Sequence, residues 1–282
     1  MKTKYQLLIV LSVLIFNILS PLLWRGSELF SQLPDTWTQK TNYGGTARFG
    51  ATSFSIGSKG YIGTGNDGTF RKDFWEFDPS VGTNGAWSQK ADFGGVARDG
   101  AVGFSIVNKG YIGTGYNAGI YYNDFWEYSP SPANSWTQKA NFGGTARFVA
   151  VGFSIGNMGY IGTGYDNADN NDFWEFDPSM GTLGTWTPKA NFLGVARESA
   201  TGFSIGNKGY IGLGYSGGFL NDFWEYTPAS GIGGGTWTQK ANFGGTARQL
   251  ATGFSIGAKG YIGVGNDGIN QKNDFWEFDP SV

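Results

Sequence analysis

A period close to fifty residues runs through this chain and limits it to repeat architectures. Five tryptophans recur at intervals of 50, 49, 50 and 51 residues: Trp37, Trp87, Trp136, Trp186 and Trp237. Five tyrosines, each within Gly-Tyr-Ile-Gly, keep the same spacing: Tyr61, Tyr111, Tyr160, Tyr210 and Tyr261. A period of this length is typical of propellers, solenoids and arrays, in which each repeat is one supersecondary unit.

Each repeat contains four short segments with strand character. In the third copy, residues 145–156 and 159–164 flank a glycine-containing tight turn of the hairpin kind. The segment Asp-Phe-Trp-Glu-Phe that follows is dense in aromatic residues, and Thr-Trp-Thr-x-Lys alternates apolar with polar residues. After the N-terminal leader, no segment keeps a 3.6-residue apolar period. The sequence therefore predicts an all-β fold, a β-propeller with one four-stranded blade per repeat.

The repeat resembles the kelch repeat, the blade unit also found in galactose-oxidase-like propellers. The resemblance is carried by the glycines after the second strand, the Tyr of Tyr-Ile-Gly, and the Trp and Asp of Asn-Asp-Phe-Trp-Glu-Phe-Asp-Pro. One departure is that the family's Gly-Gly doublet is replaced here by Gly63-Thr64-Gly65 and its equivalents. The resemblance implies a kelch-type propeller. It does not imply a function, because such propellers include enzymes, sugar binders and protein-docking modules.

The order of segments predicts how the propeller closes. The repeats begin with an outer-strand segment at 36–40 and end after the third segment of the fifth copy. The first segment would then complete the last blade, giving five four-stranded blades without an unpaired edge over residues 36–282. An incomplete set of repeats is the alternative.

The N-terminus has the features of an export signal. Lys2 and Lys4 precede a nearly continuous apolar run at 7–16, and no clear cleavage site follows. Residues 1–26 are therefore interpreted as a signal peptide or an uncleaved membrane anchor, and residues 27–35 as a linker. Both alternatives place the protein outside the cytoplasm: secreted, periplasmic or at the cell surface.

Composition excludes several classes of chemistry. The chain has no cysteine and no histidine, so Ser-His-Asp and Cys-His catalysis, His-built copper or zinc sites and disulfides are excluded. The copper chemistry of galactose oxidase is excluded with them. A net charge of −2 gives no sign of a nucleic-acid partner, and contact with a membrane is expected only through an uncleaved N-terminal segment. The acidic residues of 166–172 do not follow a calcium-loop ladder, so we expect no metal and no cofactor.

Residues that recur in every copy are expected to support the blade, because an active site is needed only once. The recurrent Asp of Asp-Phe-Trp-Glu is expected to pair with the recurrent Arg or to cap backbone groups. Function is therefore sought where the copies differ. One such position directly follows the recurrent Arg, and the other is the loop between the second and third strands. In an up-and-down blade both lie at the same end, around one mouth of the central channel.

These variable positions give the predicted ligand-binding residues. They are Phe49, Asp99, Phe148, Glu198 and Gln249 after the arginines, with Phe70, Tyr121, Tyr122, Asp166 and Phe219 in the loops. Aromatic rings beside acids and amides suit a glycan or a protein ligand. The main hypothesis is a non-catalytic binding module. The alternatives are a carbohydrate hydrolase or lyase that uses Asp99 and Glu198 as a carboxylate pair, a structural module of the cell envelope, and loops that have drifted without any ligand.

Overall fold

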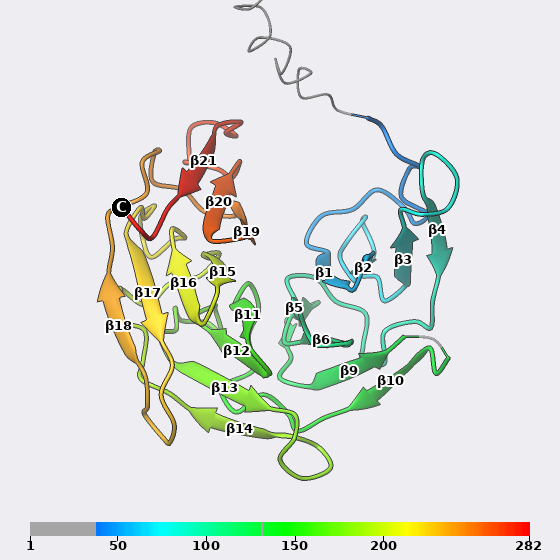
Figure 1. Ribbon diagram of the computed structural model, residues 1–282, viewed down its shortest axis with the longest axis horizontal. Coiled ribbons are helices and arrows are strands. Elements are labelled where there is room, and N and C mark those ends of the chain that lie inside the picture. Colours follow the sequence, from blue (N-terminus) through cyan, green and yellow to red (C-terminus); the bar gives the residue numbers. More distant parts are fainter. Residues whose placement is uncertain (1–37, 131) are drawn as a thin grey trace, which may run out of the picture. The chain divides into compact units, whose positions relative to one another are not determined.

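The computed structural model describes residues 38–130 and 132–282, and every regular element within them is a β-strand. Thr41–Val282 forms one compact unit and is described here by itself. Apart from one two-stranded hairpin, the strands group into five antiparallel sheets, the blades (Figure 1). The predicted all-β fold, a β-propeller of five blades, is confirmed.

The first two blades are numbered in chain order. Blade 1 consists of β1 (Thr52–Ile56), β2 (Lys59–Gly63), β3 (Phe74–Asp78) and β4 (Ala86–Gln89). Blade 2 consists of β5 (Val102–Ile106), β6 (Lys109–Gly113), β9 (Phe125–Ser129) and β10 (Ser135–Gln138). A small hairpin, β7 (Tyr116–Asn117) and β8 (Ile120–Tyr121), lies in the loop between the second and third strands of blade 2.

The remaining blades follow the same plan. Blade 3 consists of β11 (Val151–Ile155), β12 (Met158–Gly162), β13 (Phe173–Asp177) and β14 (Thr185–Pro188). Blade 4 consists of β15 (Thr201–Ile205), β16 (Lys208–Gly212), β17 (Phe223–Thr227) and β18 (Thr236–Gln239). Blade 5 consists of β19 (Thr252–Ile256), β20 (Lys259–Gly263) and β21 (Phe275–Phe278).

Neighbouring blades pack large side chains against glycines. The innermost strand β5 turns Val102, Phe104 and Ile106 toward blade 3, and all three are buried. They meet Gly152 and Gly159, where an added Cβ would lie 2.1 Å from Val102 Cγ1 and 2.5 Å from Phe104 Cε2. The glycines thus let the sheets approach closely enough to bury a ring between them, which is the main apolar stabilisation of the fold.

The innermost strands contact one another in the series β1, β5, β11, β15 and β19. Among the described strands β19 and β1 do not contact each other, and blade 5 has three strands (Figure 1). The predicted closing strand, 36–40, lies partly outside the described residues, and Thr38, Gln39 and Lys40 form no strand. The row of blades is therefore open between its two ends in the part of the chain described.

The predicted leader at 1–26 and linker at 27–35 lie outside the described residues. Within the described ranges, the structure contains no helix long and apolar enough to cross a bilayer.

Candidate binding face

The recurrent arginines and aspartates form buried ion pairs, as the sequence predicted. Arg197 is fully buried, and its guanidinium donates two hydrogen bonds of 2.6 Å to the two carboxylate oxygens of Asp222. It also donates to the carbonyl of Leu213, and Asp222 accepts a further bond of 2.8 Å from Trp224 Nε1. The same pairing occurs in the other four blades: Arg48–Asp73, Arg98–Asp124, Arg147–Asp172 and Arg248–Asp274. Each pair therefore joins the entry of the first strand to the entry of the third strand within one blade.

The recurrent glutamates also form hydrogen bonds and ion pairs within the blades. Glu225 accepts a hydrogen bond of 2.9 Å from the buried Tyr210 hydroxyl and forms ion pairs with Lys208 and Lys240. Burial raises the pKa of Tyr210, and the neighbouring Glu225 raises it further. Both acidic side chains of the repeated Asp-Phe-Trp-Glu motif therefore form structural contacts within the blades.

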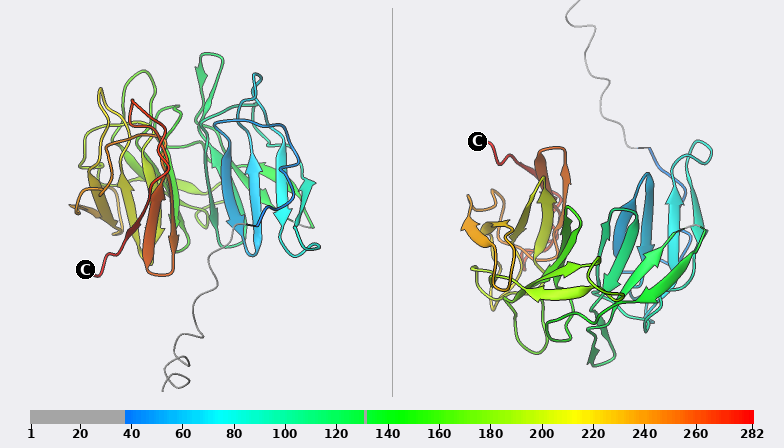
Figure 2. Two further views of the ribbon diagram at one scale, coloured as in Figure 1. Left: turned by 90° about the horizontal axis from the view of Figure 1, so that it is seen from above. Right: turned by 60° about the horizontal axis from the view of Figure 1, so that its bottom comes forward.

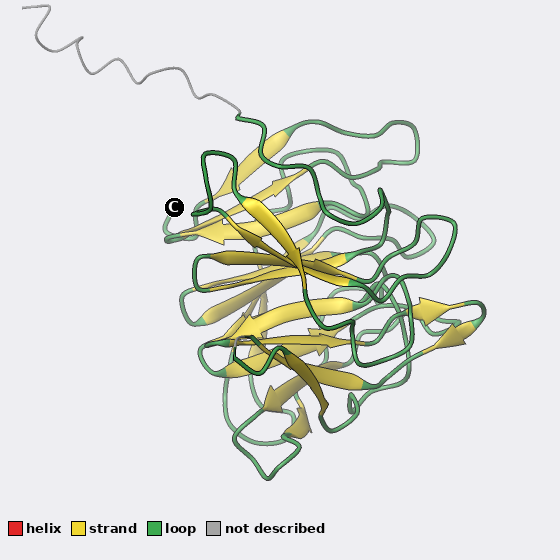
Figure 3. Ribbon diagram, turned by 90° about the vertical axis from the view of Figure 1, so that its right-hand side faces the viewer, coloured by secondary structure: helices red, strands yellow, loops and turns green. Residues whose placement is uncertain are grey.

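The variable positions after the arginines lie at one mouth of the channel. Phe148 forms an isolated antiparallel bridge with Tyr165, the third residue after β12, and the other four copies repeat this pairing. Two residues further on, Ala150 lines a central cavity of about 190 Å³, together with Ala101, Ala200 and Ala251. The loops between second and third strands lie at this end of the blades (Figure 2), where the β7–β8 hairpin projects beyond them (Figure 3). The predicted meeting of the two variable sets is therefore what the structure shows.

Five aromatic rings from blades 1 to 3 come together on this face, and we call them the five-ring cluster: Phe70, Tyr116, Tyr121, Phe148 and Tyr165. Tyr121 stacks on Phe148 with ring centroids 5.6 Å apart, and Tyr116 lies 5.5 Å from both. Tyr165 meets Phe148 edge-on at 6.0 Å, and Phe70 meets Tyr116 at 6.0 Å. All five rings are half-buried, so each keeps an accessible portion.

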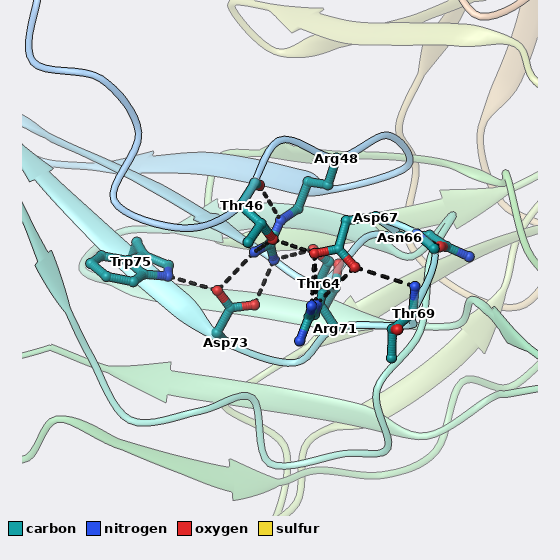
Figure 4. Close-up of polar contacts among 10 residues, drawn as sticks. Thr46, Arg48, Thr64, Asn66, Asp67, Thr69, Arg71, Asp73 and Trp75 are labelled. Carbon is teal, nitrogen blue, oxygen red and sulfur yellow. Dashed lines mark hydrogen bonds and ion pairs between the residues drawn. The ribbon is translucent and has the colours of Figure 1, made fainter.

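A cavity of about 570 Å³ adjoins this cluster at the junction of blades 1 and 2, and Phe70 lines both. Figure 4 shows the polar contacts beside this cavity, where Asp67 accepts hydrogen bonds from Thr46 and Arg71, two residues that line it. Arg71 Nη2 lies 2.8 Å from Asp67 Oδ2, which holds the pKa of that carboxyl far below its usual range. Arg48, which also lines the cavity, is likewise paired with Asp73.

The two carboxyls proposed as a catalytic pair have separate surroundings. Burial raises the pKa of Asp99, and a hydrogen bond from Asn66 partly opposes that shift. Burial also raises the pKa of Glu198, and the charge that adds to the shift is that of Asp169. The carboxylate that raises the pKa of Glu198 is therefore Asp169 in the blade 3 loop, and not Asp99.

The other predicted site residues either lie apart from the five-ring cluster or stabilise the scaffold and its loops. Phe49 is 66% exposed beside Asn66, and Gln249 occupies the equivalent place in blade 5. The ring of Tyr122 lies 4.1 Å from the Arg98 guanidinium carbon, and therefore supports the scaffold. Two further residues hold loops: Asp166 accepts a hydrogen bond from Thr145, and Phe219 packs edge-on against Tyr215.

Two members of the five-ring cluster, Tyr116 and Tyr165, were missed by the sequence analysis. Each is the third residue after the second strand and pairs by backbone hydrogen bonds with the variable position, as in Asp99 with Tyr116. The signal was available, because the register of the first two strands, continued by three pairs, places these residues opposite each other.

In the described part of the chain, no three acidic side chains gather as a metal-ion site requires. No protein-family model matches this sequence, and no curated protein matches it. Among solved structures, the chain is similar to one described as the structure of YjhT, at 18% identity, with a TM-score of 0.63 over 83% of this chain and 74% of that one. At this identity the likeness concerns the fold alone.

Proposed function

We propose that this protein is a non-catalytic β-propeller module of the kelch type that binds a glycan at the five-ring cluster. The observation that carries the proposal is the convergence of five half-buried rings at the channel mouth, next to carboxyl and amide groups. The scaffold beneath is repeated in every blade, whereas the positions of Phe148 and Tyr121 differ from copy to copy. Binding residues are commonly presented by variable loops on such a scaffold.

Sugar chemistry fits this surface better than an ion or a purely apolar ligand. The C–H faces of a pyranose stack on aromatic rings, while its hydroxyls need donors and acceptors nearby. Asn66 hydrogen bonds to Asp99 beside the cluster, and Tyr121 Oη lies 3.5 Å from Asn167 Oδ1. Amide and carboxylate oxygens at these positions can accept hydrogen bonds from the sugar hydroxyls. Binding would then leave no buried polar group of the ligand without a partner.

The test is a thermal-shift screen of the chain against a glycan panel, followed by calorimetry on the hits. A ligand of the folded state raises the melting temperature according to RT ln(1 + [L]/Kd). We expect Phe148→Ala and Tyr121→Ala to weaken binding at least about tenfold, or ~1.4 kcal/mol. Ile269→Ala is the matched control, because Ile269 is an exposed residue of the equivalent loop in blade 5. No binding across the panel by a cooperatively melting sample would reject the glycan and favour a protein ligand.

Hydrolysis of a bound glycan is the second candidate, favoured by the raised pKa of Glu198, which is the condition a general acid needs near neutral pH. Its test is turnover of the glycans that bind. An enzyme would lose almost all turnover in Glu198→Gln, whereas a binding module would show none in either form and only a modest change in affinity.

We further propose that the protein acts outside the cytoplasm. The support is the N-terminal sequence, with Lys2 and Lys4 before the apolar run at 7–16. Fractionation of cells that express the chain with a C-terminal tag tests this, and recovery of the tag in the cytosol alone would reject it.

A further inference from the structure

Two asparagines of the repeat are replaced by opposite charges at the junction of blades 1 and 2. The residue before the recurrent Asp is Lys72 in blade 1 and asparagine in the other four copies: Asn123, Asn171, Asn221 and Asn273. The residue before Phe93 and its equivalents is Asp92 in blade 2 and asparagine in the other four: Asn42, Asn141, Asn191 and Asn242. Each of the two positions departs from the repeat in one copy only.

The fold brings the two departures together. Phe93 donates its backbone N–H to the carbonyl of Lys72 at 2.8 Å, so Asp92 directly precedes a residue that is bonded to Lys72. The next three junctions repeat this bond with asparagine at both positions, in the pairs Phe142 with Asn123, Phe192 with Asn171 and Phe243 with Asn221. A cation and an anion therefore replace a pair of amides at the junction of blades 1 and 2.

Lys72 and Asp92 both line the cavity of about 570 Å³ at this junction. Sites for small molecules commonly have volumes of roughly 300–1,000 Å³. Both side chains are exposed, and within the described ranges neither of them forms a hydrogen bond or an ion pair. The cavity therefore has one charged donor and one charged acceptor that are free to meet a ligand.

The formal charges around the cavity cancel. The cations are Arg48, Arg71 and Lys72, and the acidic side chains are Asp67, Asp73 and Asp92. Arg48 pairs with Asp73 and Arg71 pairs with Asp67, which leaves Lys72 and Asp92 for the ligand. A charged ligand would meet its own sign as well as the opposite one, whereas a hydroxyl group both donates and accepts and can use both side chains. The cavity therefore suits a neutral ligand with many hydroxyl groups.

The cavity continues the surface of the five-ring cluster. Phe70 belongs to both, and its ring lies 6.0 Å from that of Tyr116, which in turn lies 5.5 Å from the ring of Phe148. The backbone holds Phe70 in this place, because Phe70 forms a bridge with Asn66 and the following N–H of Arg71 donates to the carbonyl of Gly65 at 2.8 Å. A line of rings thus leads from the channel mouth to the cavity.

We propose that the ligand of the five-ring cluster is a neutral linear oligosaccharide whose chain continues past Phe70 into this cavity, where Lys72 and Asp92 bind its hydroxyl groups. This inference rests on the proposed glycan function. One sugar unit would stack at Tyr121 and Phe148, and the following units at Phe70 and between the two charged side chains. Lys72 donates to the sugar oxygens and Asp92 accepts from the hydroxyls, and such charge-assisted hydrogen bonds are stronger than neutral ones. A monosaccharide can occupy only one of the two parts, so affinity should rise with chain length.

The experiment is titration calorimetry of the full-length chain with neutral sugars from monomer to hexamer, in three series: cello-, malto- and N-acetylchito-oligosaccharides. We expect the affinity within a series that binds to rise at least about tenfold from the monomer to the longer oligomers, because the added units reach Phe70 and the cavity. Oligogalacturonides, which carry a carboxylate on every unit, are the charged comparison. They should bind no more tightly than the neutral oligomers of equal length, because the charges around the cavity cancel.

The matched variant gives this junction the residues of the others. Lys72→Asn combined with Asp92→Asn should fold normally, since the next three junctions have asparagine at both positions. It should weaken binding of the longer oligomers at least about fivefold and leave binding of the monomer unchanged. The converse variant, Asn171→Lys combined with Asn191→Asp, adds the same charges where the blade 3 loop has Asp169 in place of Phe70. It should change neither affinity.

The outcomes separate this inference from the proposed function. Sugar binding that Phe148→Ala weakens but that does not grow with chain length would overturn the inference and leave the glycan function standing. The same holds for a length dependence that survives in the Lys72→Asn, Asp92→Asn variant, or for tighter binding of the oligogalacturonides. If no sugar binds, monomers included, the inference falls together with the glycan function.

Discussion

At the scale of single residues, the middle position of the Gly-x-Gly turn after each second strand is held under strain. Thr64, Thr114, Thr163, Leu213 and Val264 all adopt φ between 56° and 61°. This left-handed region is unfavourable for β-branched side chains and is natural for glycine. The three threonine hydroxyls are also buried without a hydrogen-bond partner. The backbone geometry therefore favours glycine at this middle position.

Replacing one of these threonines should stabilise the protein. Thr163→Gly removes both the backbone strain, which costs roughly 1–2 kcal/mol, and a buried unpaired hydroxyl, and these gains outweigh the added entropy of the unfolded chain. We expect the free energy of unfolding to rise by about 1 kcal/mol in urea titration. Thr163→Ala is the control, because it removes the hydroxyl but keeps the strain. Equal gains in the two variants would contradict the role of backbone strain.

The carboxyl of Glu198 should lower stability at neutral pH. Because burial and Asp169 raise its pKa in the folded protein, the ionised form is less favourable there than in the unfolded chain. The resulting penalty is complete above the folded-state pKa and disappears below the unfolded value of about 4.3. Glu198→Gln should therefore raise the free energy of unfolding at pH 7, and the gain should vanish toward pH 4.

Glu225→Gln provides a control of opposite sign for Glu198→Gln. Burial would raise the pKa of Glu225, but hydrogen bonds from Lys208 and Tyr210 outweigh burial and lower it. This carboxylate therefore contributes stability above its unfolded-state pKa, and that contribution is lost as pH falls through the folded-state value. The variant should be less stable at pH 7. Urea titrations between pH 4 and pH 7 measure both, and the same sign for the two variants would contradict the assignment.

At the scale of the blades, the sheets are fitted to one another by glycines of the inner strands. A Cβ at Gly152 would lie 2.1 Å from Val102 Cγ1, and a β-branched side chain cannot move away by rotation alone. We expect Gly152→Ala to lower the free energy of unfolding by roughly 1–3 kcal/mol, as overpacking does. Val102→Ala in the same protein should recover part of the loss. A double-mutant cycle measures this, and strict additivity would mean that the two side chains do not compete for space.

At the scale of the whole molecule, the sequence predicted the parts that repeat. Arg197 pairs with Asp222 and the five blades form because each repeat contains its own strands and supports. The membership of the five-ring cluster was only partly predicted, since it depends on which loops converge across blades. The pairing of residues 36–40 with the blade 5 edge stays a prediction, because part of that segment lies outside the described residues.

Blade 1 differs from the others where a preceding blade would pack. The other blades have glycine at this place, Gly103, Gly152, Gly202 and Gly253, and an added Cβ there would lie 2.1 to 2.4 Å from the preceding blade. Blade 1 has Ser53 instead, and its side chain is exposed.

Ser53→Gly should therefore lower the free energy of unfolding by roughly 0.5–1 kcal/mol, because glycine weakens a strand and, among the described strands, no preceding blade packs against blade 1. Urea titration measures the loss. Ser55→Gly on the same strand is the control, since every blade has serine at that position, and a similar loss is expected from it. A gain in stability for Ser53→Gly alone would mean that another element packs against this part of β1.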